Sequence, residues 1–145
     1  MTAKKRILIL ALVLLFCLTG GFIGYKNSKS GITSHVLHHI PELTDYAQEV
    51  LASEDSGAKE KYNSWQVTCD PDRGQVEFLT SGSGITSKGI YYSASDEPLG
   101  AQGADIPLEP HATKGNAYVW HQEDGDHWQY TERITSHWFW FEAHN

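Results

Sequence analysis

Three neighbouring histidines are the residues whose types and spacing come closest to a chemical site. His35 and His39 are four residues apart and would share one face of a helix, with His38 beside them. Two imidazoles at this spacing can begin a zinc site, and Glu42 is a possible third ligand. Glu42 lies off the ideal face, however, and no His-Glu-x-x-His pattern is present, so solvated histidines are the plainer interpretation.

An acidic turn offers a second possible cation site. Glu123, Asp124 and Asp126 could supply oxygens to Ca²⁺. A calcium loop of the EF-hand type needs ligands spread over about twelve residues, whereas this segment offers only a tight turn. Asp124-Gly125 between two runs rich in β-formers instead predicts a β-hairpin.

Motifs for phosphate binding and for nucleophilic catalysis are missing from the sequence. The run Ser81-Gly82-Ser83-Gly84 lacks the Gly-Lys-Ser/Thr of a phosphate loop. No Gly-x-Ser-x-Gly elbow occurs, and Cys69 is not surrounded by a catalytic-cysteine motif. We therefore predict no catalytic residue, no cofactor, no metal ion and no enzymatic activity.

Aromatic residues suggest a binding surface instead. Trp138, Trp140, Tyr91 and Tyr92 could form an aromatic platform for a cell-wall glycan or a peptide. Such a platform requires exposed rings, because stacking on a sugar needs an open aromatic face. The alternative use of these rings is cross-strand packing inside an antiparallel sheet.

The element that would position everything else is an apolar run from Ile7 to Gly24, which contains no charged residue. As a helix it would cover roughly 27 Å, close to the bilayer hydrocarbon core of about 30 Å. We predict a transmembrane anchor at 7–25. A cleaved signal peptide is the alternative, but the run is longer than a usual hydrophobic core of about 7 to 15 residues.

Charge predicts the orientation of this anchor and limits the partners. Lys4, Lys5 and Arg6 precede the run, which favours a cytoplasmic tail at 1–6 and places the C-terminal part outside the cytosol. Residues 1–29 hold five Lys/Arg and no acid, so the rest carries six basic and eighteen acidic residues, a net charge of 6 − 18 = −12. This charge disfavours binding to nucleic acid and to anionic lipid.

The remainder predicts one α+β domain at 33–145 after a polar linker at 26–32. From Thr33, apolar residues recur at helical spacing, and we predict one helix kinked at Pro41, although a helix that begins at Pro41 is the alternative. Gly57 could cap its end. Cys69 has no partner cysteine outside the anchor and reads as a buried residue of a strand, or else as a free thiol.

Period-two alternation follows the helix and predicts strands. Six runs have this character, and Ile106 and Leu108 could add a brief strand inside the loop at 94–116. The fold class expected is α+β, with one helix packed on an antiparallel β-meander of about five or six strands. In the last run, Trp138 and Trp140 point to one face, and Phe139 and Phe141 to the other. One pair can face the helix, while the other pair is covered by the 94–116 loop, is covered by a partner, or stays uncovered. The six runs are 64–70, 75–80, 89–93, 117–122, 127–134 and 137–142.

The chain resembles a group of small single-pass membrane proteins of Gram-positive bacteria. The resemblance rests on the glycine-rich run 81–84, on Gly89-Ile90-Tyr91-Tyr92-Ser93, on Thr131-Glu132-Arg133-Ile134-Thr135 and on the aromatic ending at 138–144. It implies an anchor and one head domain, and no activity. We expect a membrane-anchored interaction module outside the cytosol, with an envelope protein as a possible partner and no predicted oligomeric state. A secreted protein is the alternative if the anchor is cleaved.

Overall fold

A computed structural model of the chain describes Ile9, Ala11 and residues 28–53, 60–82 and 84–144. The chain divides into two compact units, residues 1–35 and 36–145, and the sheet belongs to the second. None of the helices within these described ranges is both long and apolar enough to cross a bilayer. Apart from Ile9 and Ala11, the predicted anchor at 7–25 lies outside the described residues.

Within the described residues 28–53, two helices precede the sheet, where a single kinked helix was expected. Helix α2 spans Lys29–His38 and helix α3 spans Ile40–Ala52. The helical conformation is interrupted at His39, which separates α2 from α3. Pro41 lies in the first turn of α3, where its missing N–H removes no helical hydrogen bond. The prediction of a single helix kinked at Pro41 was therefore wrong, and α2 already begins within the expected linker at 26–32. The predicted cap Gly57 lies outside the described residues.

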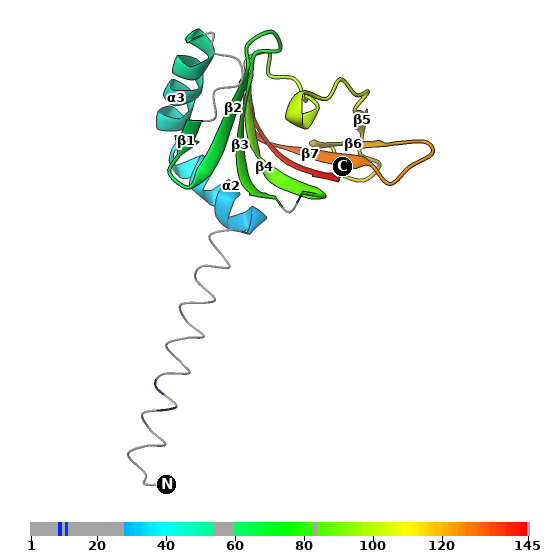
Figure 1. The fold of residues 1–145 in the computed structure, drawn as a ribbon, viewed down its shortest axis with the longest axis horizontal. Helices are drawn as coiled ribbons and strands as arrows, with labels where there is room; N and C mark the ends of the chain where they lie inside the picture. The colour runs from blue at the N-terminus through cyan, green and yellow to red at the C-terminus, as the bar shows by residue number, and fades with distance from the viewer. Residues whose placement is uncertain (1–8, 10, 12–27, 54–59, 83, 145) are drawn as a thin grey trace. The chain divides into compact units, whose positions relative to one another are not determined.

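The α+β prediction is confirmed, and the described residues form eight antiparallel strands in one sheet in place of five or six (Figure 1). A short strand before the first hairpin was missed, and a two-residue strand replaces the one expected at Ile106 and Leu108. The strands are β1 Glu60–Tyr62, β2 Trp65–Asp70, β3 Gln75–Gly82, β4 Thr86–Ser93, β5 Glu109–Pro110, β6 Ala117–His121, β7 Trp128–Thr135 and β8 Trp138–His144.

The strand order differs from a simple meander. The order is β1-β2-β3-β4-β8-β7-β6-β5. Consecutive strands are neighbours within β1 to β4 and within β5 to β8, and the two halves are joined where β4 pairs with β8. The meander prediction fails at this junction because Trp138–Phe141 are buried on both faces of β8. A strand whose side chains are apolar on both faces is typical of the middle of a sheet, where both faces are covered. At the edge of the sheet, the backbone N–H and C=O groups along one edge of the strand would have no strand to pair with.

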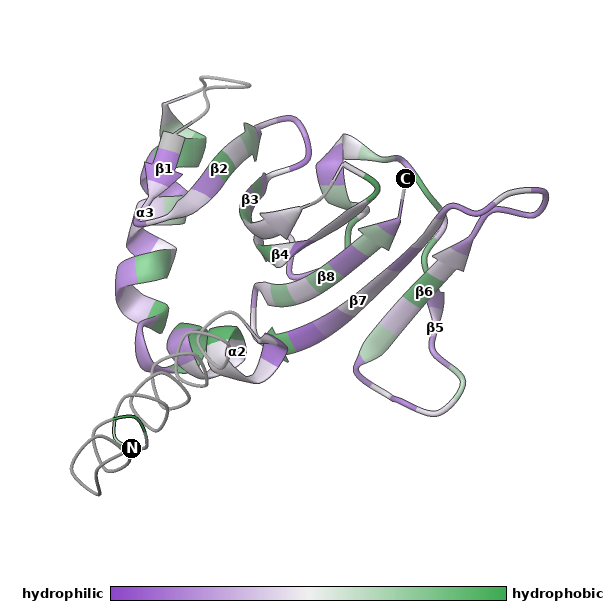
Figure 2. Cartoon of the chain, turned by 60° about the horizontal axis from the view of Figure 1, so that its bottom comes forward, coloured by the Kyte–Doolittle hydropathy of each residue, from purple (hydrophilic) through white to green (hydrophobic). Residues whose placement is uncertain are grey.

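Helix α3 covers one face of β2 and β3. Its residues Leu43 and Ala47 are fully buried, and the hydropathy along α3 alternates as expected for a helix with one apolar face (Figure 2). The indole N–H of Trp138 donates to the hydroxyl of Thr44 over 3.1 Å. Cys69 is buried on this side, with its Sγ 3.9 Å from the carbonyl oxygen of Val50, which confirms its prediction as a buried residue.

The opposite face of the sheet is covered by the segment between β4 and β5. Phe139 and Phe141 pack there in a buried cluster with Tyr91, Ala101 and Ala143. The rings of Tyr91 and Phe139 stack at 5.0 Å between centroids with 7° between their planes. Of the three alternatives left open for this pair of the last strand, the structure shows cover by the loop at 94–116, through the short 3₁₀ turn η1 at Ala101–Gly103.

Candidate functional site

The ion-binding candidates of the sequence do not assemble. Among the described residues, no group of three or more His, Cys, Asp or Glu side chains could hold a metal ion. His38 is exposed, and His35 and His39 are partly exposed on or next to α2. The acidic run at 123–126 forms the exposed turn of the β6–β7 hairpin, as the Asp-Gly signal predicted.

The expected aromatic platform does not form either. Tyr91 and Trp138 have 0% of their surface exposed, Trp140 3% and Tyr92 5%. The prediction that these four rings are open to a ligand was therefore wrong. They are buried because β8 is a central strand, so that both of its faces are covered.

A different set of aromatic and charged side chains gathers farther along the same strands. We call it the open face, and it consists of Lys88, Val119, Trp128, Tyr130, Glu132, Glu142 and His144. The pairing registers Trp128↔His144 and Tyr130↔Glu142 bring these residues to one side of β7 and β8. Every residue of the open face is partly exposed, whereas Trp138 and Trp140, on the same side of β8, are buried. The sheet therefore runs from a covered half to an uncovered half.

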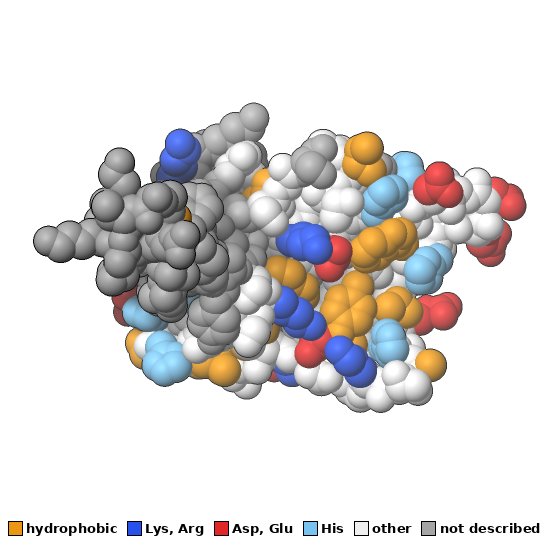
Figure 3. All heavy atoms as spheres, turned by 90° about the horizontal axis from the view of Figure 1, so that it is seen from below, with side chains coloured by type: hydrophobic (Ala, Val, Ile, Leu, Met, Phe, Trp, Pro, Cys, Tyr) orange, Lys and Arg blue, Asp and Glu red, His pale blue; other side chains and the backbone are white. Residues whose placement is uncertain are grey.

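Rings and ion pairs fix the geometry of the open face. The rings of Trp128 and His144 lie parallel within 4°, with centroids 6.1 Å apart. Lys88 Nζ lies 2.8 Å from Glu142 Oε1, and Lys114 Nζ lies 3.4 Å from Glu132 Oε2. Figure 3 shows such basic and acidic side chains lying among hydrophobic and histidine side chains. The open face is thus locally balanced in charge although the domain is strongly acidic.

Tyr130 is held at the centre of this face. Its hydroxyl donates to the carboxylate of Glu132, and Lys114 Nζ donates to the same hydroxyl over 3.2 Å. The hydrogen bond from Lys114 to Tyr130 and, to a smaller extent, the one to Glu132 raise the pKa of Lys114 above its usual value. The ammonium is fully exposed to solvent, so the pairs orient Tyr130 and contribute little stability. The result is a pre-ordered aromatic side chain at the surface.

Sequence reasoning passed over Trp128 and Tyr130, although a signal for them existed. In the run 128–134, the alternate residues Trp128, Tyr130 and Glu132 point to the same face of the strand. The aromatic face of this run therefore also carries an acidic residue. The run 138–141 has no polar residue on either side. An aromatic series interrupted by charges is typical of a face that meets water, whereas an uninterrupted one is typical of a core.

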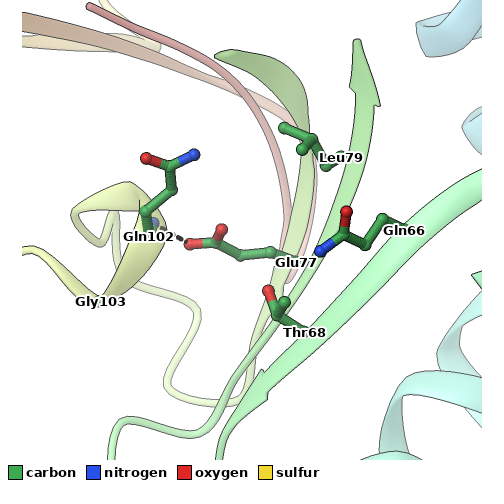
Figure 4. Close-up of a pocket in the computed structure, with 6 residues that line it drawn as sticks. All are labelled: Gln66, Thr68, Glu77, Leu79, Gln102 and Gly103. Atoms are coloured by element: carbon green, nitrogen blue, oxygen red, sulfur yellow. Dashed lines mark hydrogen bonds between the residues drawn. The ribbon is translucent and has the colours of Figure 1, made fainter. Parts of the chain in front are cut away.

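The loop-covered face holds the second candidate, a pocket of about 280 Å³ beside β2 and β3. The pocket is lined by Gln66, Thr68, Glu77, Leu79, Gln102 and Gly103. Figure 4 shows Glu77 reaching from β3 toward the turn at Gln102, with Thr68 and Gln66 of β2 beside it. The backbone N–H of Gln102 donates to Glu77 Oε1 over 2.5 Å, and the Gln75 side-chain amide donates to the same oxygen over 3.1 Å.

Glu77 is the one carboxylate among the six lining residues, and it is deeply buried. Only 6% of its surface is exposed. Loss of hydration raises its pKa to about 7, although the Gln102 N–H and the charge of Arg73 act in the opposite direction. Glu77 therefore changes its charge close to neutral pH, where an ordinary glutamate would be fully ionised.

Comparisons with protein-family models, with curated proteins and with solved structures give no match to this chain. The function therefore has to be argued from the two surfaces themselves.

Proposed function

We propose that this chain is an interaction module outside the cytosol, anchored in the cell membrane by residues 7–25 with the N-terminus in the cytosol, and that the open face docks an envelope protein. The observation that carries the proposal is the partial exposure of Trp128 and Tyr130 on strands whose other half is buried. Aromatic side chains are enriched at the centres of protein interfaces, where they bury a large area at low entropic cost. No catalytic role is proposed for the open face.

Two further properties support docking of a protein. The ion pairs of Lys88 with Glu142 and of Lys114 with Glu132 lie beside the rings, as the polar rim of an interface does. The stacking of Trp128 on His144 and the hydrogen bonds of Tyr130 fix these side chains before a partner binds. Pre-ordered side chains lose less entropy on association.

A face-specific photocrosslinking experiment in membranes tests the proposal. A photoreactive phenylalanine is placed at position 130, on the open face, or at position 118, since Tyr118 pairs with Thr131 and therefore points to the other side of the same hairpin. We expect position 130 to give one reproducible crosslinked protein that is lost with Trp128→Ala, and position 118 to give none. Equal crosslinking at both positions, or none at position 130, would overturn the proposal.

N-terminal sequencing of the mature chain tests the anchor separately. We expect the chain isolated from membranes to retain residues 7–25. A mature chain that begins after Gly24 and is recovered from the medium would replace the anchored protein by a secreted one. That result would leave the docking role of the open face to be judged by the crosslinking alone.

A further inference from the structure

The geometry points to a second, separate site: the pocket between β2, β3 and the turn at Gln102 and Gly103 binds a primary ammonium group, with Glu77 as its counter-ion. This site lies on the loop-covered side of the sheet and is independent of the open face. The ligand class is a small organic amine, or the amino group of an amino acid or peptide.

One oxygen of Glu77 is committed to the fold and the other is not. Oε1 accepts the N–H of Gln102 and the side-chain amide of Gln75. Oε2 has no hydrogen bond to any residue in the described part of the chain, although Glu77 lines the pocket and has only 6% of its surface exposed. Folding has already removed most of the hydration of Glu77, so a ligand that donates to Oε2 meets a carboxylate that is largely desolvated in the free protein.

The other lining groups fit an ammonium ion. Thr68 supplies a hydroxyl oxygen beside Glu77 in the pocket, and the Gln66 side chain lies on the same strand with the nitrogen end of its amide turned toward Glu77 (Figure 4). The Glu77 carboxylate and the Thr68 hydroxyl provide acceptors for the N–H donors of a primary ammonium group. Leu79 adds an apolar wall for an alkyl chain. A divalent metal ion fits less well, because Glu77 is the one anionic side chain of this lining.

Charges around the pocket are nearly balanced apart from Glu77. Asp70 at the end of β2 and Arg73 in the β2–β3 turn act on Glu77 with opposite signs, and the Tyr91 hydroxyl of β4 is the other titratable group coupled to it. The pKa of Tyr91 is raised to about 12, chiefly by burial, so Tyr91 remains neutral. An ammonium ion therefore pairs with one ionised carboxylate, and binding strengthens as Glu77 loses its proton with rising pH.

Titration calorimetry on the full-length chain in non-ionic detergent tests this site, with n-butylammonium as the probe and n-butanol as its uncharged counterpart. We expect butylammonium to bind at about pH 8.5 and at least about tenfold more weakly at about pH 5.5, with n-butanol giving no saturable binding. The amide resonances of Gln102 and Gly103 are expected to shift with the same affinity. Equal binding of both probes, or none by butylammonium, would overturn the assignment.

Two variants separate the site from general charge effects. Glu77→Gln removes the charge but can still accept the hydrogen bond from Gln102, and we expect it to weaken butylammonium binding at least about tenfold. Glu97→Gln makes the same charge change on an exposed residue of the loop and should bind like the natural protein. Unchanged binding in Glu77→Gln, with its amide spectrum otherwise preserved, would also refute the site.

Discussion

The two faces of the sheet are covered in different ways. On the helix-covered face, α3 packs on apolar side chains such as Phe78 and Trp138, and burial of hydrocarbon supplies the stabilisation. On the loop-covered face, a loop segment that includes the short turn η1 is held by buried polar side chains. They include Gln75, Glu77, Gln129 and Thr131.

Hydrogen bonds of the second face form a connected chain. The backbone N–H of Leu99 donates to the Tyr91 hydroxyl over 3.0 Å, which lies 2.9 Å from the hydroxyl of Thr131, and Thr131 in turn donates to the carbonyl of Trp140. The Gln129 side chain accepts from Ala101 N–H and donates to the Leu99 carbonyl. A hydrophobic cover tolerates small shifts, whereas a polar tether fixes the loop at defined points and leaves pockets between them.

Breaking the hydrophobic cover should give the largest loss of stability. Trp138→Ala removes a fully buried ring between Phe78, Tyr92 and α3. We expect the free energy of unfolding to fall by about 3–5 kcal/mol, as measured by urea denaturation. Trp138→Phe, which keeps most of the packing and loses the hydrogen bond to Thr44, should lose clearly less. Equal losses for both variants would mean that the hydrogen bond, and not burial, dominates this face.

The polar cover should make stability depend on the charge of Glu77. Its pKa is raised from 4.5 to about 7, so the folded state binds the proton more tightly. The resulting stabilisation is fully present below pH 4.5 and is lost as pH rises to about 7, an effect of about 3 kcal/mol in order of magnitude. Glu77→Gln should therefore be within about 1 kcal/mol of the natural protein near pH 5 and more stable near pH 8. Parallel curves of unfolding free energy against pH would contradict this.

Removing one tether should loosen the loop with a smaller effect on the whole domain. Gln129→Ala leaves the N–H of Ala101 and the carbonyl of Leu99 without their partner, and we expect a loss of about 1–3 kcal/mol. Hydrogen exchange of the Ala101 amide should accelerate more than that of amides in β3. Gln122→Ala, an exposed glutamine in the β6–β7 turn, is the control and should change neither quantity.

The smallest effect is expected at the beginning of the same loop. Asp96 accepts the N–H of His137 over 2.5 Å and pairs with Arg133, and these contacts, led by the His137 N–H, lower its pKa. The associated stabilisation is present above the usual pKa of an aspartate and is lost as pH falls through the lowered value, opposite in sign to Glu77. Since Asp96 is partly exposed, Asp96→Asn should cost less than about 1 kcal/mol at neutral pH. A larger loss would show that the charge itself holds the loop.

The sequence predicted the elements better than their arrangement. The strands at 65–70, 75–82 and 117–135 followed from alternation and turn residues, because these signals are local. The pairing of β4 with β8 was not predictable in this way, since it joins residues separated by about fifty positions and no local pattern encodes it. That pairing buries Trp138 and Trp140, which is why the candidate platform was wrong.

Both candidate sites depend on the same non-local contacts. The sequence shows that Trp128 and Tyr130 are aromatic residues of a strand. Their exposure depends on where α3 packs on the sheet, and no local pattern encodes that position. Glu77 looked like an ordinary surface acid of a strand with alternating residues. Only the return of the loop at Gln102 makes it a buried carboxylate.

The central place of β8 also constrains how the protein is made. Residues 138–144 pair on one side with β4 and on the other with β7, so neither half of the sheet is joined to the other until this segment is available. Strands β1 to β4 can pair with one another before that point, but the edge of β4 that faces β8 stays unpaired until residues 138–144 have been synthesised.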